Sequence, residues 1–193
     1  MSDLQTKGAA FAQKIFDDIR EMSRDVQGVS RQAFSAKETE VLNYLTDIGR
    51  GLNLEITEDR AGNVWMTLPG QDRSLPAFVS GSHVDSVPQG GNYDGLAGVT
   101  AALTVAWWMR EVGFQPKRDY TVLMMRGEES SFFGKAYMGS LGMLGKLTEK
   151  DLNLKIRDGS CTLGEAMQSC GIDTAAVSGG QPLVDIGRIA AFV

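Results

Sequence analysis

The sequence predicts an α/β fold in which a central mixed β-sheet is flanked by helices. Segments with apolar residues at helical spacing alternate with short runs rich in β-forming residues. Two of these runs end in ionisable side chains, at the strand ends where sheets of this class hold their ligands. The 193 residues are 42% hydrophobic, which suffices for one domain with a packed core.

The first part of the chain predicts two helices and a hairpin. Apolar residues recur at helical spacing over 8–24 and again over 38–52, where Gly49 and Gly51 close the second helix. The period then shortens in LEITED and NVWMTLP, two runs of β-forming residues. The turn residues 59–62 between these runs favour an antiparallel hairpin.

Two buried strands follow, and each delivers polar residues at its carboxyl end. The run LPAFVSGSH ends in His83, and a glycine-rich loop then leads into a long apolar helix over 94–112. The run DYTVLMMRGEES is a second strand, which terminates in Glu128 and Glu129. Two further short helices are expected over 147–152 and 162–170.

Composition excludes several classes of partner. A formal net charge of −5 argues against nucleic acid or an anionic membrane surface. No apolar run approaches the length of about 18 residues that a membrane span requires, and the amino terminus lacks the apolar core of a secretion signal. Cys161 and Cys170 are too few for a disulfide scaffold, lack the partner pair of a zinc site, and are expected as reduced thiols in a cytoplasmic protein.

The stretch SGSHVDSVPQGGNYDGLAG contains the single histidine of the chain. With Glu129, its His83 and Asp94 could supply ligands for divalent cations, which bind imidazole and carboxylate groups. Asp85 lies two residues after His83, hence on the same side of an extended segment, and could fix the tautomer of the ring. If the second strand continues, Glu128 and Glu129 face opposite ways, so that one binds metal while the other acts on water as general base.

Structural explanations compete for each of these residues. A lone histidine in a globular chain is usually a surface residue or a satisfied core residue. Asp94 could be the N-cap of the helix that follows it. Glu128 and Glu129 could form the solvated end of a strand. Without further information, the residues themselves leave these alternatives open.

The segments GSHVDSVPQGGNYDGLAG and RGEESSFFG together resemble the binuclear-metal amidohydrolases of the hydantoinase/carbamoylase group. The segments GVSRQAFS and AGNVWMTLPG are similar to the same group. Its members include N-carbamoyl-L-amino-acid hydrolases, β-ureidopropionases, and allantoate and ureidoglycolate amidohydrolases. The resemblance implies a zinc-exopeptidase-like catalytic domain that hydrolyses linear amide bonds, N-carbamoyl or ureido, in small acids.

The resemblance also implies a role for each residue of the site. His83 binds one of two divalent ions, zinc or manganese, Asp94 bridges both ions, and Glu129 binds the other. Glu128 is the general base, and Asp85 orients His83. A cis peptide is expected between Asp94 and Gly95.

This sequence departs from the group in two ways. The group uses two further histidines, so residues 1–193 are expected to be the amino-terminal part of the catalytic domain. The carboxyl-terminal part of that domain is then absent, as is a lid and dimerisation domain. The whole protein is expected to be a homodimer. Residues 1–193 alone are expected to be inactive. The run EESSFF, with Arg126 before it, also departs from the usual pattern and leaves the substrate subgroup open. A peptidase or N-acyl amino acid deacylase of the same clan, or a non-catalytic fragment, are the alternatives.

Overall fold

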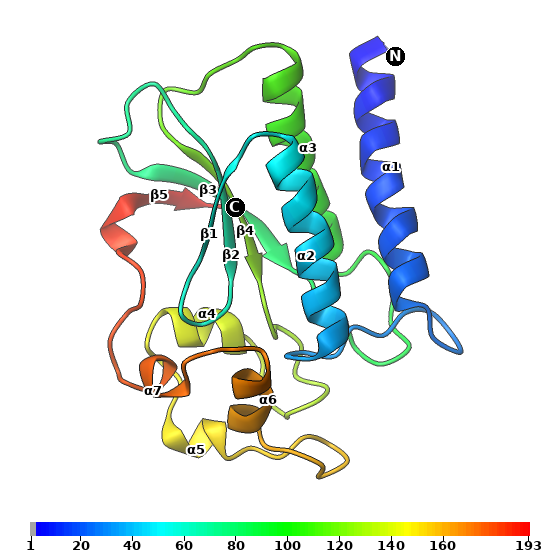
Figure 1. Cartoon of the computed structure of the whole chain (residues 1–193), viewed down its shortest axis with the longest axis vertical. Coiled ribbons are helices and arrows are strands. Elements are labelled where there is room, and N and C mark those ends of the chain that lie inside the picture. The colour runs from blue at the N-terminus through cyan, green and yellow to red at the C-terminus, as the bar shows by residue number, and fades with distance from the viewer. Residues whose placement is uncertain (1–2) are drawn as a thin grey trace.

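A five-stranded mixed sheet forms the centre of the molecule (Figure 1). The computed structural model describes residues 3–193. The strands lie in the order β1-β2-β4-β3-β5, with β1 and β2 antiparallel, β2 and β4 antiparallel, and β3 parallel to both β4 and β5. Their bounds are β1 (Glu55–Glu58), β2 (Val64–Leu68), β3 (Ala77–His83), β4 (Tyr120–Met125) and β5 (Ile189–Phe192). The predicted α/β fold with a mixed sheet is thereby confirmed.

The predicted hairpin is formed by β1 and β2. Their register runs from Glu55 opposite Thr67 to Glu58 opposite Val64. The carboxylate of Asp59 closes the turn, because one of its oxygens accepts the backbone N–H groups of Ala61 and Asn63 at 2.9 and 3.1 Å. An aspartate that bonds its own following backbone is a typical turn former.

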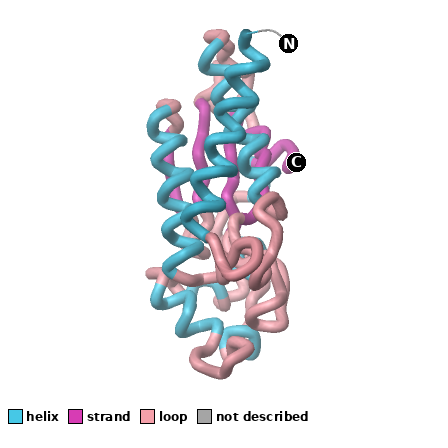
Figure 2. The backbone as a smooth tube through the Cα atoms, turned by 90° about the vertical axis from the view of Figure 1, so that its right-hand side faces the viewer, coloured by secondary structure: helices cyan, strands magenta, loops and turns pink. Residues whose placement is uncertain are grey.

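Three long helices cover one face of the sheet: α1 (Asp3–Ser23), α2 (Ala36–Gly51) and α3 (Leu96–Glu111). Figure 2 shows them layered over the strands. Alternate sheet residues such as Met66, Val122 and Met124 point into this layer and form one core with the apolar stripes of the helices. None of the described helices is both long and apolar enough to cross a membrane.

Four short helices lie at the end of the sheet where β3 and β4 finish (Figure 1), and their apolar residues form a second core. They are α4 (Met138–Met143), α5 (Glu149–Leu152), α6 (Leu163–Ser169) and α7 (Thr174–Val177), and a 3-10 turn, η1 (Ile186–Arg188), precedes β5. Val79 and Leu123, which face away from the long helices, belong to this second core. The sheet therefore has a layer of long helices on one face and a segment of short helices that contacts the other face near the carboxyl ends of β3 and β4.

The structure corrects two predicted boundaries next to the site. Helix α3 begins at Leu96, because Gly95 is its N-cap with φ of 67°, and no side chain caps the helix. The interpretation of Asp94 as N-cap is therefore wrong. Strand β4 ends at Met125, opposite His83, so Glu128 and Glu129 are not part of a continuing strand. The chain turns away after β4 because Gly127 adopts φ of 57°.

Candidate metal centre

His83 is the last residue of β3 and lies against the loop that leads into α3. Its side chain is 8% exposed. A Cβ atom at Gly95 would come within 2.5 Å of Cε1 of the ring, and Gly95 also has positive φ. Only glycine meets both demands without strain. The local sequence Asp-Gly therefore lets the chain pass directly over the imidazole.

Asp85 is fully buried and joins His83 to the loop after β4. Nδ1 of His83 lies 3.0 Å from the backbone oxygen of Asp85 and 3.2 Å from Oδ1 of its carboxylate. Two oxygens on this side of the ring favour a proton on Nδ1, which leaves Nε2 free as a ligand atom. The same carboxylate accepts the backbone N–H groups of Glu128 and Glu129, both at 3.0 Å. Asp85 thus orients the ring and the acidic residues together.

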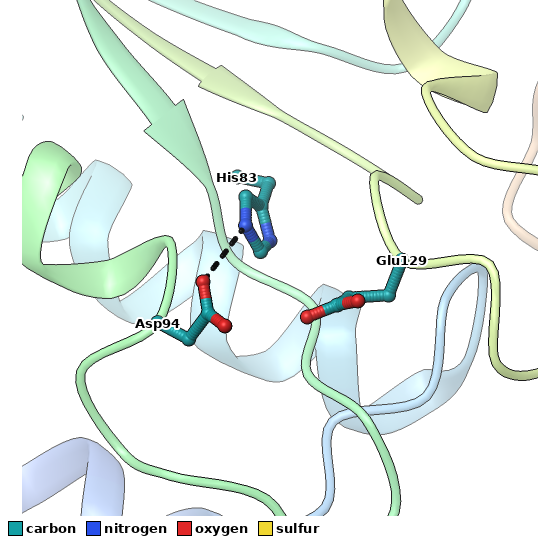
Figure 3. Close-up of side chains that lie close together, drawn as sticks. All are labelled: His83, Asp94 and Glu129. Carbon is teal, nitrogen blue, oxygen red and sulfur yellow. Dashed lines mark ion pairs between the residues drawn. The ribbon is translucent and has the colours of Figure 1, made fainter.

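Nε2 of His83 faces three carboxylates. Ligand atoms of His83, Asp94 and Glu129 all lie within 4.8 Å of one another, and Figure 3 shows both carboxylates pointing toward the ring. The Nε2 atom is 3.6 Å from Oδ1 of Asp94 and 3.8 Å from Oε2 of Glu128. Among the described residues this is the one cluster of three such side chains. Residues that are distant in the sequence therefore meet at one end of the sheet.

The electrostatics of the cluster favour a bound cation. Burial lowers the pKa of His83, but the hydrogen bond and charge of Asp85 outweigh burial, so the pKa is raised. Partial burial raises the pKa of Glu129, and the nearby carboxylates of Asp94 and Glu128 raise it further against the effect of His83. Neighbouring carboxylates contribute to both shifts. Imidazole and carboxylate groups are ligands for zinc and manganese. The side chain of Asp94 is 71% exposed, so the cluster is open to solvent. The residues present therefore fit a divalent ion.

The structure brings together all five residues that the sequence singled out. It contradicts one expectation about them, because no cis peptide occurs among the described residues and the Asp94–Gly95 peptide is trans. The left-handed φ of Gly95 redirects the chain into α3 through a trans bond instead. Sequence reasoning missed Glu38 and Asn63, two fully buried polar residues beside the loop after β4. Glu38 follows Ser35 in a pattern typical of a helix start, which hides any second role.

Known proteins with similar sequences are hydrolases. The family model described as Peptidase family M28 matches residues 63–153. The chain is 32% identical over 163 residues to an N-carbamoyl-L-amino-acid amidohydrolase of Pseudomonas sp. (strain NS671), covering 84% of this chain and 39% of the relative. It is 37% identical over 134 residues to a ureidoglycolate hydrolase of Oryza sativa subsp. japonica, covering 69% of this chain and 28% of the relative.

A solved hydantoinase/carbamoylase family amidase from Burkholderia ambifaria superposes with a TM-score of 0.77 at 26% identity, over 85% of this chain and 40% of that one. The resemblance to hydantoinase/carbamoylase amidohydrolases is confirmed. A structure of AtUAH in complex with (S)-hydroxyglycine shares the fold over the whole of this chain, with a TM-score of 0.83 at 24% identity. The chain spans less than half of the length of each of these four proteins.

Proposed function

We propose that this chain contributes a metal centre to a hydrolase that cleaves linear amide bonds, N-carbamoyl or ureido, in small acids. The observation that supports this function most directly is the cluster of His83, Asp94 and Glu129 beside Glu128. The names of the relatives, carbamoyl-amino-acid and ureidoglycolate hydrolases, indicate the bond class. The substrate is a small molecule, and no nucleic acid or membrane is involved.

In this proposal His83 would hold one of two divalent ions, Glu129 would hold the other, and Asp94 would serve both. Ions held by these side chains would supply Lewis acidity toward the scissile carbonyl group and toward water. Zinc and manganese both fit the imidazole and carboxylate donors. Asp85 keeps Nε2 of His83 directed at the cluster by holding the Nδ1 side of the ring.

Glu128 is proposed as the general base. Its carboxylate lies beside the cluster, with Oε2 3.8 Å from Nε2 of His83. It accepts a proton from the attacking water as the C–O bond forms, and returns this proton to the leaving nitrogen as the C–N bond breaks. The side chain is 29% exposed, so that water and substrate reach it.

Residues 1–193 are proposed to be the amino-terminal part of the catalytic domain of a longer, cytoplasmic, homodimeric protein. The relatives are more than twice as long, and the resemblance implies two more histidine ligands and a lid in the additional length. With three of the ligands present, we expect residues 1–193 alone to bind zinc weakly and to hydrolyse no substrate at a useful rate.

A peptidase or deacylase acting on N-acyl amino acids is the second candidate function, and the match to Peptidase family M28 favours it. The chain, with any further sequence that its gene encodes, should be assayed on N-carbamoyl, ureido and N-acyl amino acids with zinc or manganese. Release of ammonia from the first two classes supports the proposal. Hydrolysis of N-acyl substrates alone would favour the deacylase, and no hydrolysis of any class would favour a non-catalytic protein.

A further inference from the structure

The residues that follow β4 form what we term the acid loop, residues 126–129, which carries Glu128 and Glu129. Its four consecutive backbone N–H groups donate in order to Asn63, to Glu38 and twice to Asp85, at 3.1, 2.9, 3.0 and 3.0 Å. All three acceptor side chains are fully buried. The amide edge of the loop is therefore held by side chains of three distant segments and not by a strand partner.

The opposite edge of the acid loop is also bonded. Backbone N–H groups of residues 137–139 donate to the carbonyl oxygens of 128, 127 and 126, at 2.9, 2.8 and 3.0 Å. The loop backbone is thus held from both sides by groups that differ in kind. Backbone donors hold its carbonyl edge, whereas its amide edge depends on single side chains that substitution can remove one at a time.

Glu38 has the most demanding position among the three acceptors. Its carboxylate receives the backbone N–H of Phe34 at 2.8 Å, that of Gly127 at 2.9 Å, and Nε of Arg126 at 2.7 Å. A buried carboxylate is costly unless its oxygens are fully bonded and its charge is paired. Capping of α2 requires no burial, because Ser35 already accepts the backbone N–H of Glu38. The contacts to the acid loop therefore account for the burial of this charge.

We infer that Glu38 is a positioning residue, which sets the direction of the Glu128 and Glu129 side chains by holding the backbone of the acid loop. This inference rests on the proposed function, since it concerns the same metal cluster. Gly127 is the residue at which the chain leaves the strand direction, with φ of 57°. A bond at its amide governs the path of the two glutamates that follow. Displacement of such a group by about 1 Å is enough to impair a site strongly.

The primary test is titration of the metal-free chain with cobalt(II), read by its visible absorption spectrum and by calorimetry. Glu38→Gln removes the charge while it keeps the size of the side chain. We expect about tenfold or more weaker cobalt affinity and an altered spectrum, as for other residues that orient ligands. Asp119→Asn is the matched control, because Asp119 is also a buried carboxylate that accepts a backbone N–H, that of Gly70 at 2.8 Å. Asp119 lies just before β4, whereas the cluster lies at the other end of this strand. It should leave affinity and spectrum unchanged. Wild-type affinity and spectrum in Glu38→Gln would overturn the inference.

A second variant keeps the inference testable if Glu38→Gln does not fold. Glu38→Met combined with Arg126→Met replaces a buried ion pair by apolar side chains of similar size, a change that proteins often tolerate. It removes the acceptor of the Gly127 amide without leaving a buried charge unpaired. We expect this folded double variant also to bind cobalt more weakly than wild type. Wild-type binding by the double variant would refute a positioning role.

Amide hydrogen exchange of the metal-free protein separates the inference from the proposed function. Loss of acceptor oxygens at Glu38, one in Glu38→Gln and both in the double variant, should speed exchange at residues 127–129 by about tenfold, whereas Asp119→Asn should not alter exchange there. Wild-type protein that binds no cobalt would contradict the proposed metal centre, and the exchange result would still decide the role of Glu38. Unchanged protection of residues 127–129 in both Glu38 variants would overturn that role.

Discussion

The carboxylate of Asp85 lies 3.2 Å from Nδ1 of His83 and couples this ring to the acid loop. Both carboxylate oxygens are also acceptors of loop amides, at 3.0 Å each. One buried side chain therefore determines the tautomer of the proposed metal ligand and the position of the adjacent acids. Substitution of Asp85 should consequently affect both His83 and the acid loop.

Asp85→Asn tests this coupling. An amide side chain offers one oxygen in place of two, and its NH2 group would oppose a loop amide or the ring proton. We expect zinc affinity to fall by about 10- to 100-fold and the free energy of unfolding to fall by about 1–3 kcal/mol. Zinc calorimetry and denaturant unfolding measure the two effects. Unaltered zinc affinity would show that the histidine is oriented without Asp85.

Gly95→Ala should damage the site through direct contact with the imidazole. The added Cβ would come within 2.5 Å of His83, and the backbone there has positive φ. Gly113→Ala is a matched control, because its φ of 66° is nearly equal to the 67° of Gly95, while a Cβ there meets nothing within 4 Å. Both variants should lose about 1 kcal/mol or more from backbone strain. Only Gly95→Ala should also lose zinc affinity, and equal zinc binding by both variants would contradict the contact.

The stability of the metal-free protein and its affinity for zinc should change in opposite directions with pH. Burial lowers the pKa of His83, but Asp85 outweighs it, and the pKa lies above its usual 6.5. The stability contributed by protonated His83 is therefore complete below pH 6.5 and disappears as pH rises through the raised pKa. Zinc requires the neutral ring, so its affinity should increase over the same interval.

Unfolding and zinc titrations across this pH interval measure both trends. His83→Gln removes the ionisable ring and should abolish this contribution to the pH dependence of stability. Zinc affinity that stays constant through the interval would argue against His83 as a ligand.

Single substitutions of Glu128 and of Glu129 should distinguish the proposed general base from the proposed metal ligand. In the whole protein, Glu128→Gln should reduce kcat by about 10²- to 10⁴-fold with zinc affinity retained, because a general base is lost. Glu129→Gln should reduce zinc affinity, because a ligand is lost. Zinc calorimetry and steady-state kinetics on both variants give the comparison. Loss of metal affinity in Glu128→Gln with normal affinity in Glu129→Gln would reverse the assigned roles.

Local patterns in the sequence predicted most of the fold because their causes are local. The apolar stripe of α2 repeats within each turn, and Asp59 closes the β1–β2 turn by bonding residues two and four positions ahead. The predicted start of α3 and the predicted end of β4 were wrong because each depends on the backbone conformation of one residue. Helix α3 begins where it does because Gly95 has positive φ, and β4 is followed by Gly127, which also has positive φ. The sequence shows that these residues are glycines but does not show which backbone conformation they adopt.

By itself the sequence determined the alternation of helices and strands, and which motifs supply imidazole and carboxylate groups. Only the tertiary structure decided how these groups are held, because the decisive bonds join residues far apart in the chain. Asp85 reaches amides 43 and 44 residues ahead, and Glu38 reaches one 89 residues ahead. A bond from a buried side chain to a distant backbone amide leaves no periodic trace in the sequence. It exists only once the strands are paired and the loop lies beside them.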